Sequence, residues 1–219
     1  IELARGLEDE GIISRNVTPD GWSLESGDTL LSESDGYVSC ASDDRPSNRV
    51  GHNLPNIHGV LAGALGPPDT AYAQWPAFDV FVGYLVFDAW IANTDRHAIN
   101  WGVLTCDTDA SKALASSFDH GSALASGATD EHLATIDVQR FAERGFAHRF
   151  EDGKRLPLVD LALAAEAAAT PRARIWRERV VAVTDGDIDA VLGRMYGMSE
   201  ARTTFLSSLL TINQRRLEP

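Results

Sequence analysis

The sequence predicts an α+β protein with a small β-rich opening and a mostly helical remainder. Residues 1–50 contain short strand-like stretches separated by turn signals such as Thr18-Pro19-Asp20-Gly21. One strongly apolar helix is predicted over residues 75–92, and further helical segments fill the chain after residue 136. Hydrophobic residues make up 44% of the 219 residues, which is enough for a packed core.

The opening is expected to contain strands at 11–15 and 22–24, with a break at 26–28. The Ser-, Asp- and Gly-rich stretch 32–50 predicts a mobile loop. Moderate helical periodicity covers 52–65 and ends at Gly66-Pro67-Pro68.

The predicted helix at 75–92 has apolar residues such as Phe78, Phe81 and Leu85 at three- and four-residue intervals, so we expect it to be buried. Pro76 is compatible with its first turn. Two short strands at 101–105 and 113–118, joined by the acidic turn 107–109, and a loop at 121–135 are expected next. Helices are then predicted at 137–144, 158–170, 171–183, 187–196 and 199–215, with Asp185 or Asp187 capping the fourth and Ser199 the fifth.

Charge and composition restrict the class of partner. The net charge is −13, which argues against nucleic acid or an anionic membrane surface as the main partner. No apolar run reaches the roughly 18 residues of a membrane span, and no secretory leader is expected. Cys40 and Cys106 have no metal-like spacing, so we expect two free thiols in a cytoplasmic protein.

Polar residues with chemical potential follow the apolar helix directly. Asp95, Arg96, His97 and Asn100 fall within six residues, and Asp119 follows a predicted strand. Burying so many polar groups is costly unless they bond one another or a ligand. Phosphoryl transfer needs a carboxylate to orient the attacking hydroxyl and oxygen ligands for Mg²⁺. Asp95 fits the first role, and Asn100 and Asp119 fit the second, although the spacing alone is weak evidence.

The longer sequence context resembles HipA-like kinases, which are bacterial serine/threonine kinases. The resemblance is carried by LVFDAWIANTDRHAINWGVL at 85–104 and SFDHGS at 117–122, and more loosely by the hinge-like stretch 24–32, the stretch 141–150 and the helical tail. It implies a two-lobed kinase fold that uses ATP and Mg²⁺. It implies that Asp95 is the catalytic aspartate of the N-T-D-R-H-x-x-N loop and that Asn100 and Asp119 are catalytic metal ligands. Leu30, Leu31 and His97 are the expected nucleotide contacts.

The resemblance also implies a division of the chain. Residues 1–50 would form a partial N-lobe and hinge region, and 51–219 a helical C-lobe with the catalytic loop at 93–105 and the metal-binding segment at 113–122. Residues 1–94 contain no lysine for the ATP phosphates and no Gly-rich phosphate loop. Arginine is a poor substitute for that lysine. We therefore expect the N-lobe proper to lie upstream of Ile1 or on another chain.

Partners and alternative functions follow from the same resemblance. A protein substrate and, as in toxin–antitoxin members, an antitoxin are the implied partners. A fragmentary or inactive kinase fold that acts as a binding module is the alternative that the missing lysine suggests. A kinase of small molecules or lipids is a third hypothesis, and the acidic composition argues against a membrane substrate.

Several polar residues have structural interpretations as well. Asp88 is expected to bond the loop from the helix end, and Arg96 to pair with Asp88 or Asp119 rather than with phosphate. His97 and His120 are expected to be hydrogen-bonding struts. A zinc site from His97, His120 and Asp119 has no supporting spacing.

Overall fold

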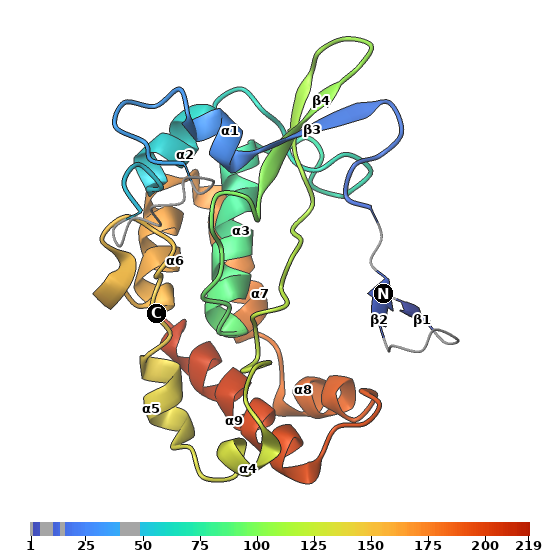
Figure 1. Ribbon diagram of the computed structural model, residues 1–219, viewed down its shortest axis with the longest axis vertical. Helices are drawn as coiled ribbons and strands as arrows, with labels where there is room; N and C mark the ends of the chain where they lie inside the picture. The colour runs from blue at the N-terminus through green and yellow to red at the C-terminus, as the bar shows by residue number, and fades with distance from the viewer. Residues whose placement is uncertain (1, 5–10, 14–15, 40–48) are drawn as a thin grey trace.

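The computed structural model describes residues 2–4, 11–13, 16–39 and 49–219, and it confirms a mostly helical α+β protein with a small antiparallel sheet (Figure 1). Strands β3 (Trp22–Ser26), β4 (Gly102–Cys106) and β5 (Lys112–Leu114) pair in that order. A separate two-stranded sheet pairs β1 (Glu2–Ala4) with β2 (Gly11–Ile13). The strands predicted at 11–15 and 22–24 form as β2 and β3 and belong to different sheets.

The three-stranded sheet joins segments that are far apart in the sequence. Trp22 lies opposite Cys106 and Ser26 opposite Gly102, so β3 pairs with β4 across the division expected at residue 50. The turn before β3 forms as predicted, with Gly21 at a φ of 78° and the Trp22 amide donating to the Pro19 carbonyl. The sheet places the start of β4, directly after the polar loop, beside the end of β3.

The remaining regular secondary structure of the described chain is helical. Two short helices were not predicted: α1 replaces the expected break at 26–28, and α4 lies in the expected loop 121–135. The side chains of Ser26 and Thr129 cap the N-termini of these helices, which stabilises helices that are otherwise very short. The helices are α1 (Gly27–Leu31), α2 (Leu54–Val60), α3 (Ala77–Trp90), α4 (Asp130–Leu133), α5 (Val138–Glu143), α6 (Leu158–Ala168), α7 (Ile175–Val181), α8 (Asp185–Leu192) and α9 (Glu200–Arg216), with 3₁₀ turns at Gly153–Arg155 and Pro171–Arg174.

The caps of the last two helices differ in how well they were predicted. Ser199 caps α9 by accepting from the Arg202 amide, as predicted. Thr184, rather than Asp185 or Asp187, caps α8, and Asp187 completes a capping box from the third helical position. The prediction was wrong because the helix begins two residues earlier than its apolar periodicity indicated.

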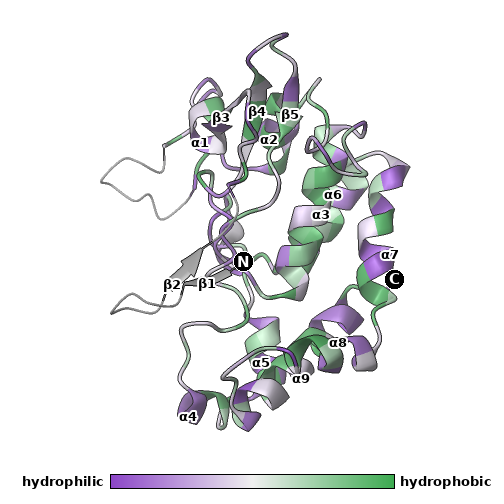
Figure 2. Cartoon of the chain, turned by 90° about the vertical axis from the view of Figure 1, so that its right-hand side faces the viewer, coloured by the Kyte–Doolittle hydropathy of each residue, from purple (hydrophilic) through white to green (hydrophobic). Residues whose placement is uncertain are grey.

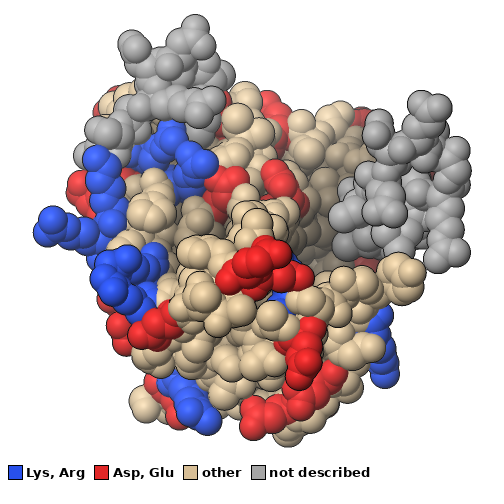
Figure 3. Space-filling view, turned by 60° about the horizontal axis from the view of Figure 1, so that its bottom comes forward, with Lys and Arg blue, Asp and Glu red and all other residues tan. Residues whose placement is uncertain are grey.

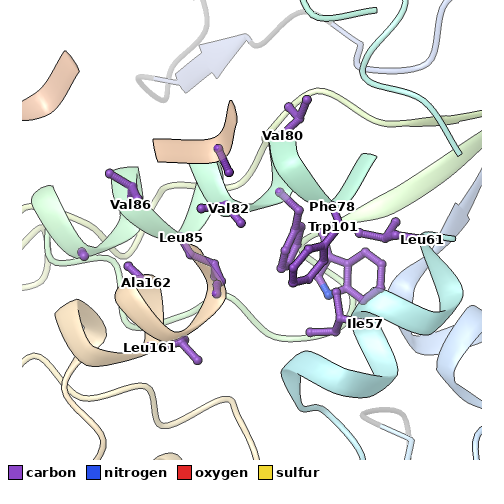
Figure 4. Packing of buried hydrophobic residues seen from close by; sticks show 14 of the residues in the cluster. Ile57, Leu61, Phe78, Val80, Val82, Leu85, Val86, Trp101, Leu161 and Ala162 are labelled. Carbon is purple, nitrogen blue, oxygen red and sulfur yellow. The ribbon is translucent and has the colours of Figure 1, made fainter. Parts of the chain in front are cut away.

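Helix α3 is the centre of the main hydrophobic core. It is buried on nearly all sides and packs against α2, α6 and α7, as Figures 2 and 4 show. A second cluster forms where α4, α5 and α8 pack on α9. In Figure 1, α3 lies above α9, and the chain that follows β5 runs down from the sheet to α4.

Trp101 anchors the polar loop to the N-terminal part. Its ring is almost fully buried, and a Cβ atom at Gly27 would lie 2.2 Å from it, so only glycine fits at the start of α1. The Gly27 amide donates to the Trp101 carbonyl and the Asp28 amide to the Ala98 carbonyl, both at 2.9 Å. Helix α1 is therefore docked directly on the loop 93–101.

Two further sequence predictions concern thiols and membrane spans. Cys106 is a free thiol, whereas Cys40 and much of the expected loop 32–50 lie outside the described residues. In the part of the chain that the structure describes, no helix combines the length and apolarity required to cross a membrane.

Candidate active site

The polar loop begins where α3 ends in a tight turn. Ala92 has a φ of 53°, a left-handed conformation that is unfavourable for residues other than glycine. The Leu124 amide donates to the Ile91 carbonyl at 2.9 Å, which ties this turn to the segment that follows β5. Asp119 also has a left-handed φ, of 54°. Such conformations cost on the order of 1–3 kcal/mol and cluster at functional sites.

Arg96 is a buried clamp that joins the loop to the Asp119 segment. Its side chain is 1% exposed and makes a two-pronged ion pair with Asp88, at 2.7 and 2.8 Å. The same guanidinium donates to the carbonyls of Asn100 and Phe118, at 2.6 and 3.3 Å. The predicted structural pairing of Arg96 is thus confirmed, with Asp88 rather than Asp119 as its partner. Arg96 therefore holds Asn100 close to Phe118, the residue before Asp119.

Asp95 lies at the entrance of this arrangement and is partly exposed. Its Oδ1 accepts a hydrogen bond from Arg149 Nε at 2.6 Å, within an ion pair whose side chains are 25% and 36% exposed. Its Oδ2 accepts from the Ser122 hydroxyl at 3.3 Å. The carboxylate is therefore oriented by two groups and still accessible to a ligand.

Asn100 and Asp119 offer oxygen atoms to a cation. Asn100 Nδ2 donates to the Asp95 carbonyl at 2.9 Å, which turns the amide oxygen away from that bond. Asn100 is only 3% exposed, and among the described residues no group donates to its amide oxygen. Asp119 is exposed and is not engaged by any described donor. An amide and a carboxylate oxygen, each free of protein donors, fit the ligand preference of Mg²⁺.

The buried His52 bonds the backbone of Arg149. His52 Nδ1 lies 2.6 Å from the Arg149 carbonyl, and His52 Nε2 accepts from the Trp101 indole at 3.1 Å. This pattern requires a neutral ring with its proton on Nδ1. Burial lowers the pKa of His52 from 6.5 to about 4. His52 therefore links Arg149, which bonds Asp95, to the buried Trp101 at the end of the loop.

The two histidines of the site act as hydrogen-bonding groups. The Ile99 amide donates to His97 Nδ1 at 3.2 Å, and His120 Nε2 lies 2.8 Å from the Ser117 hydroxyl. Partial burial lowers the pKa of His97, against the opposing effect of the nearby Asp95 and Asp119 carboxylates. The described residues contain no group of three or more His, Cys, Asp or Glu side chains that could bind a metal, so the zinc alternative has no support.

The predicted nucleotide contacts differ in accessibility. Leu31 is fully buried in the main core. Leu30 is partly exposed on the same short helix, and His97 is partly exposed in the loop. Nucleotide contacts by Leu30, Leu31 and His97 all stay predictions.

A cavity of about 740 Å³ adjoins Asp95. Asp95 itself does not line it, but Thr94 precedes Asp95 in the chain, and the hydroxyl of Ser122 bonds the Asp95 carboxylate. Residues of α5 and residues that follow it complete much of the lining. The cavity therefore lies next to the candidate catalytic loop.

Sequence reasoning missed Arg149 as a site residue. It lies 54 positions after Asp95, in a stretch whose only signal was a loose similarity over 141–150. Nothing in its local pattern distinguishes it from the other 16 arginines of the chain. Its role depends on the fold, which places 149–151 against Gly51, His52 and Asn53.

Comparison with solved structures places this architecture among kinases. The chain is similar to the crystal structure of CtkA, a proinflammatory kinase of Helicobacter pylori. The TM-score is 0.58 at 18% sequence identity, over 90% of this chain and 68% of that one. No protein-family model and no curated protein matches the sequence. The fold is therefore kinase-like, while the HipA-like resemblance depends on the sequence motifs.

Proposed function

We propose that this protein is an ATP-dependent protein serine/threonine kinase of the HipA-like type. The observation that carries the proposal is the joint placement of Asp95, Asn100 and Asp119. The Arg96 clamp bonds the carbonyls of Asn100 and Phe118, and Asn100 bonds Asp95. A kinase-like fold in which Arg96 joins the loop of Asp95 and Asn100 to the segment of Asp119 supports phosphoryl transfer.

In the proposed reaction, the substrate hydroxyl bonds to Asp95 and attacks the γ-phosphorus of ATP. A new oxygen–phosphorus bond forms, the bond to the β-phosphate oxygen breaks, and ADP leaves. The hydroxyl proton passes to the Asp95 carboxylate. Arg149 and Ser122 orient that carboxylate, so they are positioning residues.

Asn100 and Asp119 would bind Mg²⁺, which supplies charge neutralisation on the phosphates when it is bound. Their contribution from this chain is an amide oxygen fixed by the Asn100–Asp95 bond and a carboxylate at an exposed left-handed turn. Residues 1–94 contain no lysine, so this part of the chain supplies no lysine to the ATP phosphates.

The test is transfer of phosphate from labelled ATP by the full-length gene product in the presence of Mg²⁺. Asp95→Asn keeps the shape of the side chain and removes its basicity, so we expect kcat to fall by roughly 10²–10⁴-fold. Asp107→Asn, on the exposed β4–β5 turn, is the matched control and should leave the rate unchanged. Equal rates for the Asp95→Asn variant and the wild type would refute the assignment of Asp95.

A binding module of the kinase fold is the second candidate, and the absence of lysine from residues 1–94 favours it. ATP affinity separates the two functions. A kinase binds ATP–Mg²⁺ and loses Mg²⁺-dependent affinity in Asp119→Asn, because a metal ligand is removed. If the protein is a binding module instead, neither the wild type nor Asp119→Asn binds the nucleotide.

A further inference from the structure

The cavity beside Asp95 combines apolar walls with cationic side chains that have no acidic partner. Phe141 and Ile136 contribute apolar surface. Arg140 on α5 and Arg144, the C-cap residue of the same helix, are four positions apart and exposed at the cavity. Neither forms an ion pair with a described residue.

Acidic residues lie near this wall as well. Asp137 lines the cavity and keeps its negative charge while its carboxylate accepts the Arg140 backbone amide as the N-cap of α5, so the charged lining consists of two arginines and one aspartate. Glu143 accepts from Gln139 on the same helix. His132 and His148 add further hydrogen-bonding groups to the lining. On the face in Figure 3, most basic side chains lie on one side, with acidic side chains both among them and across the rest of the face.

We infer that this cavity binds an acidic segment of the protein substrate and presents its serine or threonine to Asp95. The inference rests on the proposed function and names the class of substrate. Charge complementarity favours carboxylate side chains opposite Arg140 and Arg144. The apolar walls suit a peptide better than a nucleic acid, whose binding depends mainly on contacts to phosphates. The end at Thr94 and Ser122 adjoins the base, so the acidic residues lie within a few positions of the phosphorylated one.

Binding of labelled peptides by the full-length protein tests the inference without requiring catalysis. The probes are a serine peptide flanked by glutamates, the same peptide flanked by lysines, and a single-stranded oligonucleotide, followed by fluorescence anisotropy. We expect the glutamate peptide to bind about tenfold more tightly than the lysine peptide. The variant R140E/R144E should invert this preference, and R140Q/R144Q should abolish it.

The matched control is R194E/R215E, which makes the same change in net charge at exposed arginines outside the cavity. It should keep the wild-type preference. An unchanged preference in R140E/R144E, equal affinity for both peptides, or oligonucleotide binding as tight as that of the glutamate peptide would each overturn the inference. Thermal unfolding of each variant checks that it is folded, and R140Q/R144Q provides the test if the charge reversal unfolds α5.

Phosphorylation of the same peptides separates this inference from the proposed function. Phosphorylation of both peptides at equal rates, with equal affinities, would refute the inferred peptide site and support the proposed kinase activity. Preferential binding of the glutamate peptide without transfer from ATP would keep an acidic-segment site and refute the kinase.

Discussion

Two ion pairs flank the candidate catalytic loop and have the same chemistry in opposite environments. Arg96 and Asp88 are each 1% exposed and make bonds only within the protein core. Arg149 and Asp95 are 36% and 25% exposed, and their pair lies at the solvent-accessible end of the site. Buried pairs are costly to break because one charge is left without a partner, whereas exposed pairs contribute little to stability. Burial therefore makes the first pair structural and leaves the second available to a substrate.

The largest expected effect comes from breaking the buried pair. Asp88→Ala leaves the Arg96 guanidinium without its counter-ion in the core, so we expect about 3–5 kcal/mol less stability in urea unfolding. The double variant Asp88→Ala with Arg96→Met removes both charges and should recover part of that loss. A cost below 1 kcal/mol for Asp88→Ala would mean that burial does not distinguish the two pairs.

The next effect concerns His52, which supports Arg149 from the core. Because its folded pKa of about 4 is below the ordinary 6.5, the neutral ring stabilises the fold fully above about pH 6.5. This contribution, at most about 3 kcal/mol, is lost as the pH falls towards 4. In chemical unfolding between pH 7 and pH 4, His52→Gln should show a weaker pH dependence than the wild type. His58→Gln, at an exposed histidine on α2, should keep the wild-type dependence; an identical slope in both variants would contradict this role.

The smallest effect on stability is expected at the exposed pair. Arg149→Ala should change the free energy of unfolding by less than about 1 kcal/mol. Under the proposed function it should lower kcat by about tenfold with little change in KM for ATP, because the Asp95 carboxylate loses its orientation. Arg149→Lys should restore part of kcat, and Arg155→Ala, at an exposed arginine six residues on, should have no effect. A loss of stability without a loss of kcat would make Arg149 a structural residue like Arg96.

The local elements of the fold were largely predictable from the sequence. Helix α3 was predicted within two residues at each end, because its apolar residues continue around the whole helix. The prediction of Ser199 as the cap of α9 was confirmed, because a cap depends on neighbours a few positions away. Helix α4 was missed, since a four-residue helix that begins at Asp130 has too little periodicity to stand out.

The sequence by itself determined the type of loop, the three oxygen-bearing side chains and the helix that leads into them. Those features depend on short-range patterns and on motifs formed by consecutive residues. Only the tertiary structure decided that β3 pairs with β4, that Asp88 neutralises Arg96, and that Arg149 meets Asp95. These contacts join segments whose relative position is set by packing around α3 and Trp101, and such packing leaves no local signal in the chain.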